Sequence, residues 1–166
     1  AAQVVLEDKI AHPILLGNRE HIESITEEYQ INLPGVQIID PQKPLNQKEI
    51  ETHKKYGALF LEKRKRKGIT AVDAEVVMRS RSYYGAMMVE TGDADAMIGG
   101  LAKKYPYTIR PALQIIGAKE RVNKVASVHI LMTKSGPLFL ADTTINHHLS
   151  AEDVADITEL VAEAVE

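Results

Sequence analysis

An arginine, a threonine and a glycine pair are the residues of this sequence best suited to chemistry. Gly99 and Gly100 follow a short apolar run that predicts a strand, and Thr108 is expected to begin the next helix, with Arg110 in its first turn. Free backbone N–H groups and the positive end of the helix dipole bind anions there, and a guanidinium adds a planar pair of donors. This order of residues predicts an anion site that suits phosphate or phosphoanhydride groups.

The same residues also have purely structural interpretations. Arg110 could pair with a nearby carboxylate such as Asp93 or Asp95, and a Gly-Gly sequence is favoured wherever a turn needs it. Arg64 is a second candidate, because it lies near the end of a long predicted helix in the charge run 62–67. A charge run at a helix C-terminus, however, is usually a solvated face that complements the helix dipole.

Polar residues also follow the second of two later β-rich runs. Asp142 could orient a substrate group or act as a base, with Asn146 beside it, but both could equally stabilise a turn through hydrogen bonds to nearby backbone. The neighbours His147 and His148 cannot point to one face of a regular element, and no carboxylate at metal-ligand spacing completes a set. No metal site is expected.

Strands and helices alternate over most of the chain. The expected strands are 13–16, 36–39 and 94–98, and the expected helices are one capped by Asn18, 46–67, 70–80, 82–91 and one capped by Thr108. Two helix starts carry the spacing of a capping box, in which a polar residue is followed three positions later by an acid. This alternation predicts an α/β fold with a mostly parallel sheet covered by helices on both sides.

The pattern changes after about Gly117. Two β-rich runs, 124–133 and 137–142, are separated by so few residues that they can only pair antiparallel, and a helix is expected at 150–166. We therefore expect a first lobe at 1–120 and the start of a second lobe at 121–166. Both lobes are expected to be incomplete and the fold truncated at both ends, because the first helix lacks an N-cap and the last helix lacks a C-cap.

Composition argues against several functional classes. The chain of 166 residues has 20 basic and 23 acidic residues and a formal net charge of −3, which argues against nucleic-acid or membrane-surface partners. It has no cysteine, which excludes disulfides and thiolate chemistry and favours a cytoplasmic location. No apolar run approaches the roughly 20 residues that span a bilayer. Neither a P-loop nor a dinucleotide-binding fingerprint is present.

Five ordered segments resemble the phosphate acetyltransferase and butyryltransferase family: 64–70, 92–100, 108–117, 136–142 and 150–153. Segments 78–90 and 105–110 look more like the transacetylase-like C-terminal domain of bacterial hybrid NADP-dependent malic enzymes. The resemblance implies a three-layer, isocitrate-dehydrogenase-like (phosphotransacetylase) fold. In that fold, two lobes flank a cleft that takes coenzyme A and acyl phosphate.

The resemblance also implies ligands and partners. Transferases of the family convert acetyl-CoA and phosphate to acetyl phosphate and CoA, whereas the related domain of hybrid malic enzymes senses acetyl-CoA as an allosteric inhibitor. NADP and a divalent metal would bind to a malic domain that is absent from this sequence. The chain alone is therefore expected to be inactive. A homo-oligomer, a dimer or larger, is expected.

Residue by residue, Arg64 and Arg110 match arginines of the family's cleft. Together with Gly99, Gly100, Thr108, Asp142 and Asn146 they are the expected substrate-binding or CoA-binding residues, and no catalytic residue is assigned. The loop 101–107 departs from the transferases, because Leu-Ala-Lys-Lys-Tyr-Pro-Tyr replaces a run of Ser and Thr hydroxyls that help to hold phosphate.

Two lysines in this loop can still attract a CoA phosphate as point charges. The departure favours an acetyl-CoA-binding regulatory domain of a malic enzyme. A catalytic phosphate acetyltransferase is the alternative, and an interaction domain that retains only the fold is a third possibility.

Overall fold

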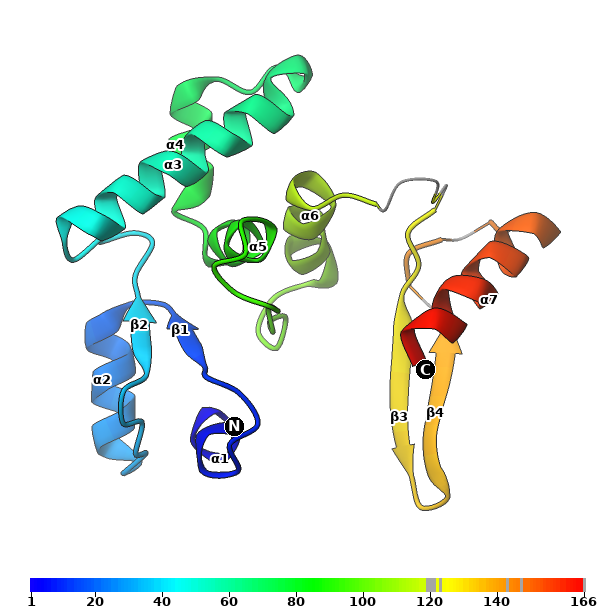
Figure 1. The fold of residues 1–166 in the computed structure, drawn as a ribbon, viewed down its shortest axis with the longest axis horizontal. Helices are drawn as coiled ribbons and strands as arrows, with labels where there is room; N and C mark the ends of the chain where they lie inside the picture. The colour runs from blue at the N-terminus through cyan, green and yellow to red at the C-terminus, as the bar shows by residue number, and fades with distance from the viewer. Residues whose placement is uncertain (119–121, 123, 143, 147, 166) are drawn as a thin grey trace. The chain divides into compact units, whose positions relative to one another are not determined.

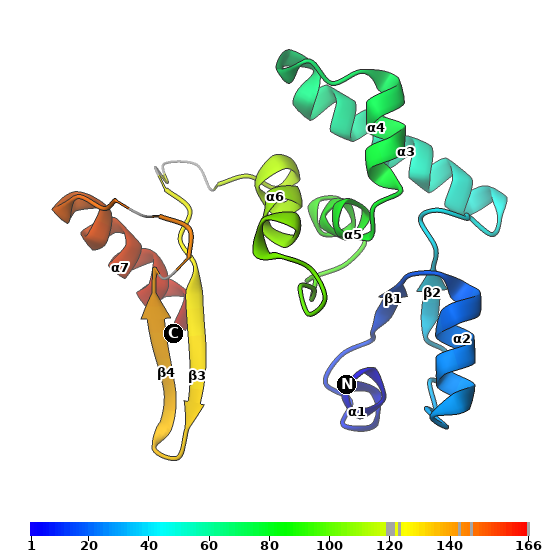
Figure 2. The same ribbon diagram turned by 180° about the vertical axis from the view of Figure 1, so that it is seen from behind.

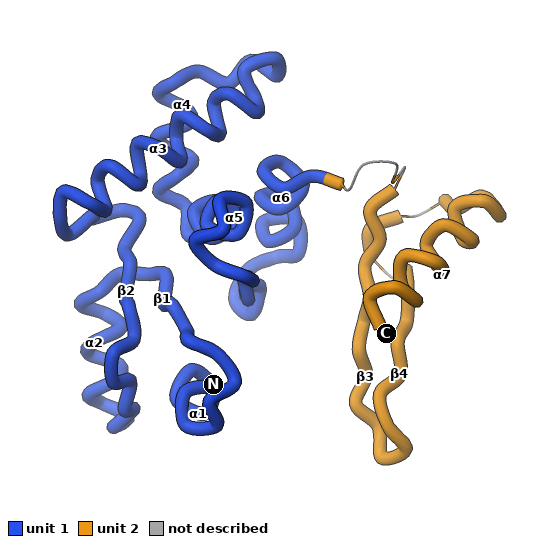
Figure 3. Tube along the Cα trace, viewed as in Figure 1, with its two compact units in different colours: residues 1–117 blue, residues 118–166 orange. Residues whose placement is uncertain are grey.

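The computed structural model of the chain describes residues 1–118, 122, 124–142, 144–146 and 148–165. Its helices are α1 (Ala2–Glu7), α2 (Arg19–Glu28), α3 (Gln47–Arg64), α4 (Ala71–Met78), α5 (Arg81–Glu90), α6 (Tyr105–Ile115) and α7 (Ala151–Val165). Its strands are β1 (Ile14–Leu16), β2 (Gln37–Ile39), β3 (Val128–Thr133) and β4 (Gly136–Ala141). The chain forms two compact units, residues 1–117 and 118–166 (Figure 3). The boundary expected between residues 120 and 121 lies outside the described residues.

The first unit contains the parallel strand pair that the sequence predicts. β1 and β2 pair in register from Ile14 opposite Gln37 to Leu16 opposite Ile39, and α2 connects them (Figures 1 and 2). Asn18 caps α2, because its side-chain oxygen accepts a hydrogen bond from the His21 N–H at 2.8 Å. The first strand-helix-strand prediction is therefore confirmed.

The predicted third strand at 94–98 is wrong. The backbone N–H groups of Asp93 and Ala94 both donate to the Met88 carbonyl as the chain leaves α5, and residues 94–98 form no ladder with β1 or β2. The Ile98 side chain is 100% exposed. An apolar run becomes a strand only where a neighbouring strand offers matching N–H and C=O groups, and this segment forms no such pairing.

The long helix and its successor follow their sequence signals closely. Asn46 caps α3 through the Glu49 N–H, at 2.9 Å, and a 3₁₀ turn at Lys65–Lys67 leads to Gly68, whose φ of 82° lies in the left-handed region. Thr70 and Asp73 then form a reciprocal capping box at the start of α4. Both capping predictions are confirmed, and only the last turn of the long helix differs in type.

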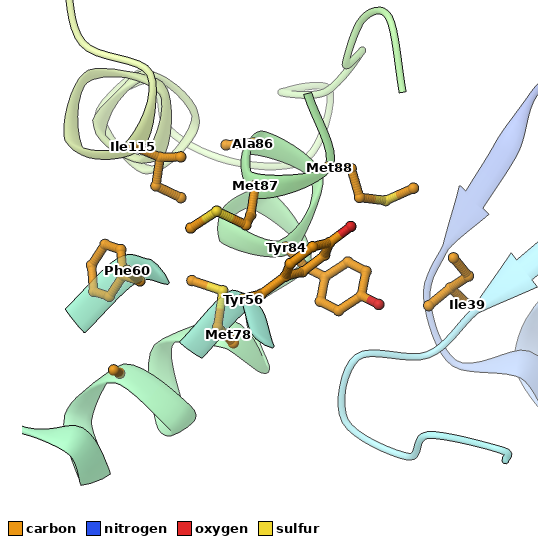
Figure 4. Packing of buried hydrophobic residues seen from close by; sticks show 10 residues of the cluster. Ile39, Tyr56, Phe60, Met78, Tyr84, Ala86, Met87, Met88 and Ile115 are labelled. Carbon is orange, nitrogen blue, oxygen red and sulfur yellow. The ribbon is translucent and has the colours of Figure 1, made fainter. Parts of the chain in front are cut away.

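The core of the first unit lies mainly among helices (Figure 4). Its buried residues come from β2 and from α3 to α6: Ile39, Tyr56, Phe60, Ala74, Met78, Tyr84, Ala86, Met87, Met88 and Ile115. Tyr56 and Tyr84 meet edge to face, with ring centroids 5.0 Å apart. α5 supplies more buried residues than any other helix, so its position fixes those of its neighbours.

A glycine allows α5 to lie close to the strand pair. A Cβ atom on Gly85 would lie 2.6 Å from the Met97 sulfur and 3.1 Å from Leu16 Cδ1. We expect Gly85→Ala to lower the free energy of unfolding by about 1 kcal/mol, because overpacking outweighs the gain in helix propensity. Gly57→Ala in α3 is the control, since its Cβ would meet Glu75 atoms only at 3.9 Å and should stabilise the helix. Urea unfolding that shows both variants stabilised would contradict this prediction.

The second unit is a hairpin with one helix. β3 and β4 pair antiparallel from Val128 opposite Ala141 to Thr133 opposite Gly136, as the short connection predicts. α7 contacts β4, and its Ile157 is buried. Ser150 and Asp153 form a capping box ahead of α7, with hydrogen bonds in both directions at 2.8 and 3.1 Å.

Candidate anion-binding site

α6 begins four residues earlier than the sequence suggests. Its N-cap is Lys104, and Pro106 occupies the first turn, where a missing N–H removes no hydrogen bond. Thr108 is therefore inside the helix and is not its cap, and Pro111 lies in the interior of the helix and not in its first turn. Arg110 becomes the sixth helical residue, beyond the free N–H groups. The expected contribution of the helix N-terminus to its anion binding is thus corrected.

Arg110 nevertheless lines a pocket. The pocket has a volume of about 540 Å³ and is lined by Ser80, Tyr83, Ala102, Lys103, Lys104, Tyr107, Arg110 and Pro111. This volume lies within the range of about 300–1,000 Å³ that is usual for small-molecule sites. Three of the lining residues are cationic, and none carries a carboxylate. The charge of this lining would favour an anionic ligand.

Tyr83 links the two predicted arginines. Burial raises the pKa of its hydroxyl, and the positive charges of Arg110 and Arg64 oppose that rise, so both guanidinium groups act on this phenol. The Tyr83 hydroxyl donates to Gln114 Oε1 at 2.8 Å, which ties α5 to α6. Its ring meets the Phe60 ring edge to face at 5.7 Å. Both arginines are thus close enough to Tyr83 for their charges to act on its hydroxyl.

Arg64 differs from the other cations of its charge run. It is half-buried while Lys63, Lys65, Arg66 and Lys67 are exposed. Its Nε atom is buried and accounts for one of three buried polar side-chain atoms without a hydrogen-bond partner among the described residues. A buried N–H without a partner costs free energy, so it favours a ligand that accepts a hydrogen bond. The structure thus separates Arg64 from the solvated face that the run would otherwise form.

Gly100 and Thr108, both predicted site residues, lie in contact. The backbone of Gly100 has a φ of 106°, and a Cβ there would lie 3.4 Å from Thr108 Oγ1. That hydroxyl oxygen is buried and also has no hydrogen-bond partner among the described residues. Gly99 is exposed, and a Cβ added to it would meet nothing within 4 Å in the described part of the chain.

The carboxylates proposed as structural partners of Arg110 do not pair with it. Asp93 accepts hydrogen bonds from the hydroxyls of Tyr56 and Thr91, each at 2.6 Å, and these bonds lower the pKa of its carboxyl. Asp95 is exposed. Across the described ranges, Arg110 has no carboxylate within 4.0 Å. Its charge is therefore available to a ligand.

Asp142 and Asn146 belong to the second unit and form a local network there. Asp142 accepts hydrogen bonds from the Ser127 N–H at 3.0 Å, from the Ser127 hydroxyl and from the Asn146 N–H at 3.0 Å. Asn146 also donates to the Val125 carbonyl at 3.0 Å. This is the turn-stabilising arrangement that the sequence left open as the alternative to a binding role. A role for these two residues in ligand binding stays a prediction.

The same network predicts sensitivity to acid. Burial alone would raise the pKa of the Asp142 carboxyl, but hydrogen bonds from Ser127 and Asn146 outweigh it and hold the pKa well below its usual range. A depressed pKa stabilises the folded state above the unfolded value of about 3.9, and that stability is lost as the pH falls further. We expect β3 and β4 to lose amide protection below about pH 4.

Asp142→Asn is expected to destabilise the hairpin at neutral pH by about 1–3 kcal/mol and to flatten its acid dependence, because the amide cannot accept the same donors. Asp156→Asn is the control, since this exposed carboxylate in α7 accepts no hydrogen bond in the described residues. Hydrogen exchange of β3 and β4 as a function of pH measures both effects. Equal acid profiles for wild type and Asp142→Asn would refute the assignment.

The described residues hold no group of three or more His, Asp or Glu side chains arranged to bind a metal ion. His147, one of the two adjacent histidines considered above, lies outside them. No helix among them is both long and apolar enough to cross a bilayer.

Sequence reasoning missed Tyr83, Tyr107 and Ser80 as pocket residues. Tyr83 and Ser80 were visible only as part of a segment that resembles malic enzymes. Helical spacing could have found Tyr107, because Tyr107, Arg110, Pro111 and Gln114 lie on one face of α6 once its start is set at Tyr105.

The first unit thus combines a parallel strand pair with a pocket lined by three cations, as expected of an α/β domain. The family described as phosphate acetyl/butaryl transferase matches residues 1–166, and the chain belongs to this family. The phosphate acetyltransferase of Nitratidesulfovibrio vulgaris is 36% identical over 157 residues, which cover 95% of this chain and 21% of that protein. The NADP-dependent malic enzyme of Haemophilus influenzae is 33% identical over 169 residues, covering 99% of this chain and 22% of that protein.

Solved structures agree on the fold. A phosphotransacetylase from Streptococcus pyogenes superposes with a TM-score of 0.82 at 29% identity, covering 95% of this chain and 46% of that one. EutD phosphotransacetylase from Staphylococcus aureus gives 0.78 at 26% identity, covering 94% and 45%. The fold is thus the α/β fold of phosphotransacetylases. The chain spans less than half of the length of each of these four proteins.

Proposed function

We propose that this chain is an acetyl-CoA-binding regulatory domain of an NADP-dependent malic enzyme, which oxidatively decarboxylates malate to pyruvate. The observation that carries the proposal is the composition of the pocket. Lys103 and Lys104 line it from the loop in which transferases, by resemblance, carry Ser and Thr hydroxyls. Lysines supply charge for binding an anionic ligand without the fixed donors that orient a reacting phosphate.

The matched residues support a binding role. Arg110 lines the pocket. The charge of Arg64 acts on Tyr83, another pocket residue, and the buried Nε atom of Arg64 has no hydrogen-bond partner among the described residues. Acetyl-CoA carries several phosphate charges, so it suits a pocket lined by three cations and no carboxylate. The relative from Haemophilus influenzae, named as a malic enzyme, adds support because it matches almost the whole chain.

In this proposal the malic reaction takes place in a separate domain of the parent protein, where NADP and a divalent metal would bind. Acetyl-CoA binding here would change the malic activity through the subunit contacts of a homo-oligomer, a dimer or larger. Coupling of this kind is typically worth about 1–3 kcal/mol, so acetyl-CoA should weaken the binding of malate by about 5- to 150-fold. A cytoplasmic location accords with these substrates.

A catalytic phosphate acetyltransferase is the second candidate. It is favoured by the retention of both cleft arginines, which could hold anionic oxygens as phosphate attacks the thioester, and by the relative from Nitratidesulfovibrio vulgaris. In this case the pocket would hold both acetyl-CoA and phosphate.

The test is malate-dependent NADP reduction by the intact parent protein, with and without acetyl-CoA. Reduction that falls as acetyl-CoA is added is the expected result. A parent that forms acetyl phosphate from acetyl-CoA and phosphate, and reduces no NADP with malate, would overturn the proposal in favour of the transferase.

A further inference from the structure

The segment 94–104 leads from the end of α5 to α6 without joining a sheet. Its residues form no ladder with β1 or β2, and its last two residues, Lys103 and Lys104, line the pocket. The ladder hydrogen bonds of a sheet fix the course of a strand. Since this segment forms no such bonds with β1 or β2, its course depends on the contacts that hold the chain where it leaves α5.

α5 ends in a Schellman motif. The Gly92 N–H donates to the Val89 carbonyl at 3.2 Å, the Asp93 N–H donates to the Met88 carbonyl at 2.8 Å, and the φ of Gly92 is 75°. These hydrogen bonds all lie within the end of α5. They fix the local turn of the chain, but they do not attach it to another helix.

The Asp93 carboxylate makes the contact with a second helix. Its Oδ2 atom accepts a hydrogen bond from the Tyr56 hydroxyl of α3 and another from the Thr91 hydroxyl, each at 2.6 Å. Tyr56 is only 1% exposed, and its ring meets that of Tyr84 edge to face in the core (Figure 4). A buried tyrosine is a rigid donor, because its ring is packed and its hydroxyl requires a partner.

We propose that Asp93 is a positioning residue: through its hydrogen bond with Tyr56 it sets the course of the segment 94–104, and thereby the position of Lys103 and Lys104. Both hydroxyls donate to the same oxygen, so the role requires one well-placed acceptor and not a negative charge. The expected effect on acetyl-CoA affinity rests on the proposed function, whereas the effect on the segment itself does not.

The test is native-state hydrogen exchange of the intact parent protein with Tyr56→Phe. This substitution removes only the hydroxyl and leaves the sequence of 88–104 unchanged, so the intrinsic exchange rates there stay the same. We expect the hydrogen-bonded amides of Asp93, Ala94 and Lys103 to exchange about 2- to 10-fold faster, the effect of losing one hydrogen bond. Acetyl-CoA affinity, measured by calorimetry, should fall by a similar factor.

Tyr84→Phe is the matched control. It removes a hydroxyl from a second buried tyrosine of the same cluster, and that hydroxyl donates no hydrogen bond among the described residues. Neither the exchange of 93–103 nor the affinity for acetyl-CoA should change. Urea unfolding of both variants shows whether any faster exchange is local or reflects the stability of the whole unit.

Substitutions of Asp93 separate position from charge. Asp93→Ala should reproduce the loss of affinity caused by Tyr56→Phe, whereas Asp93→Asn should restore most of it, because its carbonyl oxygen can still accept from both hydroxyls. Asp95→Ala removes the neighbouring exposed carboxylate, which accepts no hydrogen bond among the described residues, and should leave affinity unchanged. An effect of general destabilisation would not be restored by the amide.

The outcomes distinguish this inference from the function on which its last step rests. Exchange that is unchanged in Tyr56→Phe, or equally fast in Tyr84→Phe, would overturn the inference while acetyl-CoA binding by the wild type leaves the function standing. An Asp93→Asn protein as weak as Asp93→Ala would show that the charge matters and would also overturn it. A wild-type parent that binds no acetyl-CoA would overturn the function, and the exchange rates would then decide the inference by themselves.

Discussion

Replacing Arg110 with alanine is expected to weaken acetyl-CoA binding by about 10- to 100-fold, because hydrogen bonds to charged groups are each worth about 1.5–3 kcal/mol. The guanidinium lines the pocket, and no carboxylate of the described residues competes for it. Calorimetric titration of the intact parent protein measures the loss. The same variant should abolish inhibition by acetyl-CoA while malate oxidation itself is unchanged.

Two further variants show whether the shape or the charge of Arg110 matters. Arg110→Lys keeps the charge and loses the planar fork, so an intermediate affinity is expected. Arg66→Ala removes another exposed charge, from the 3₁₀ turn after α3 and outside the pocket lining, and should have little effect. Because Arg110 is exposed, its contribution should shrink as salt is added. Equal losses for Arg66→Ala and Arg110→Ala would indicate a general charge effect and remove Arg110 from the site.

Most of the helices and strands could be predicted from signals between residues that are close in sequence. Capping boxes such as Thr70 with Asp73 satisfy their own backbone groups within four residues, so sequence alone places them correctly. The hairpin of β3 and β4 is similar, because a connection of so few residues allows only one pairing. Predictions of this kind depend on neighbours in sequence, and the structure confirms them.

The two errors depended on contacts that sequence does not show. Residues 94–98 are as apolar as a strand, but their backbone finds no pairing strand, and Met97 packs against α5 at Gly85 instead. The start of α6 was set at Thr108 because threonine is a good N-cap, whereas Pro106 fits the first turn of a helix that starts earlier. The preference for threonine at an N-cap and the preference for proline in the first turn predict different starts for this helix, and the sequence alone does not decide between them.

Arg110 lines the pocket for a different reason than the sequence suggests, and its role in binding stays a prediction. Arg110 was chosen for a helix N-terminus that it does not occupy, yet it lines the pocket together with Lys103 and Lys104. Tyr83 could not be found by motif, because its importance lies in contacts across helices α3, α5 and α6. Asp142 was chosen because a carboxylate can act in catalysis. In the structure it accepts hydrogen bonds from the nearby Ser127 and Asn146 N–H groups.

Phe60→Ala is expected to lower the free energy of unfolding of the first unit by about 3–5 kcal/mol, the largest stability effect predicted for this chain. Phe60 is 1% exposed and lies within the cluster formed by α3, α4, α5 and α6. Removing the ring leaves a cavity that close-packed neighbours can fill only in part. Since domains are stable by about 5–15 kcal/mol, much of the total would be lost. Urea unfolding with an unchanged slope measures the effect.

The same variant tests whether the core supports the pocket. The Phe60 ring contacts Tyr83 edge to face, and Tyr83 is a pocket wall, so loss of the ring should also loosen the site. Phe60→Leu restores apolar volume without the aromatic edge and should recover more stability than ligand affinity. Met78→Ala is the control, because Met78 is fully buried in the same cluster and does not line the pocket. If Phe60→Ala and Met78→Ala reduced ligand affinity equally, the effect would reflect global stability, and the contact between Phe60 and Tyr83 would have no specific role in binding.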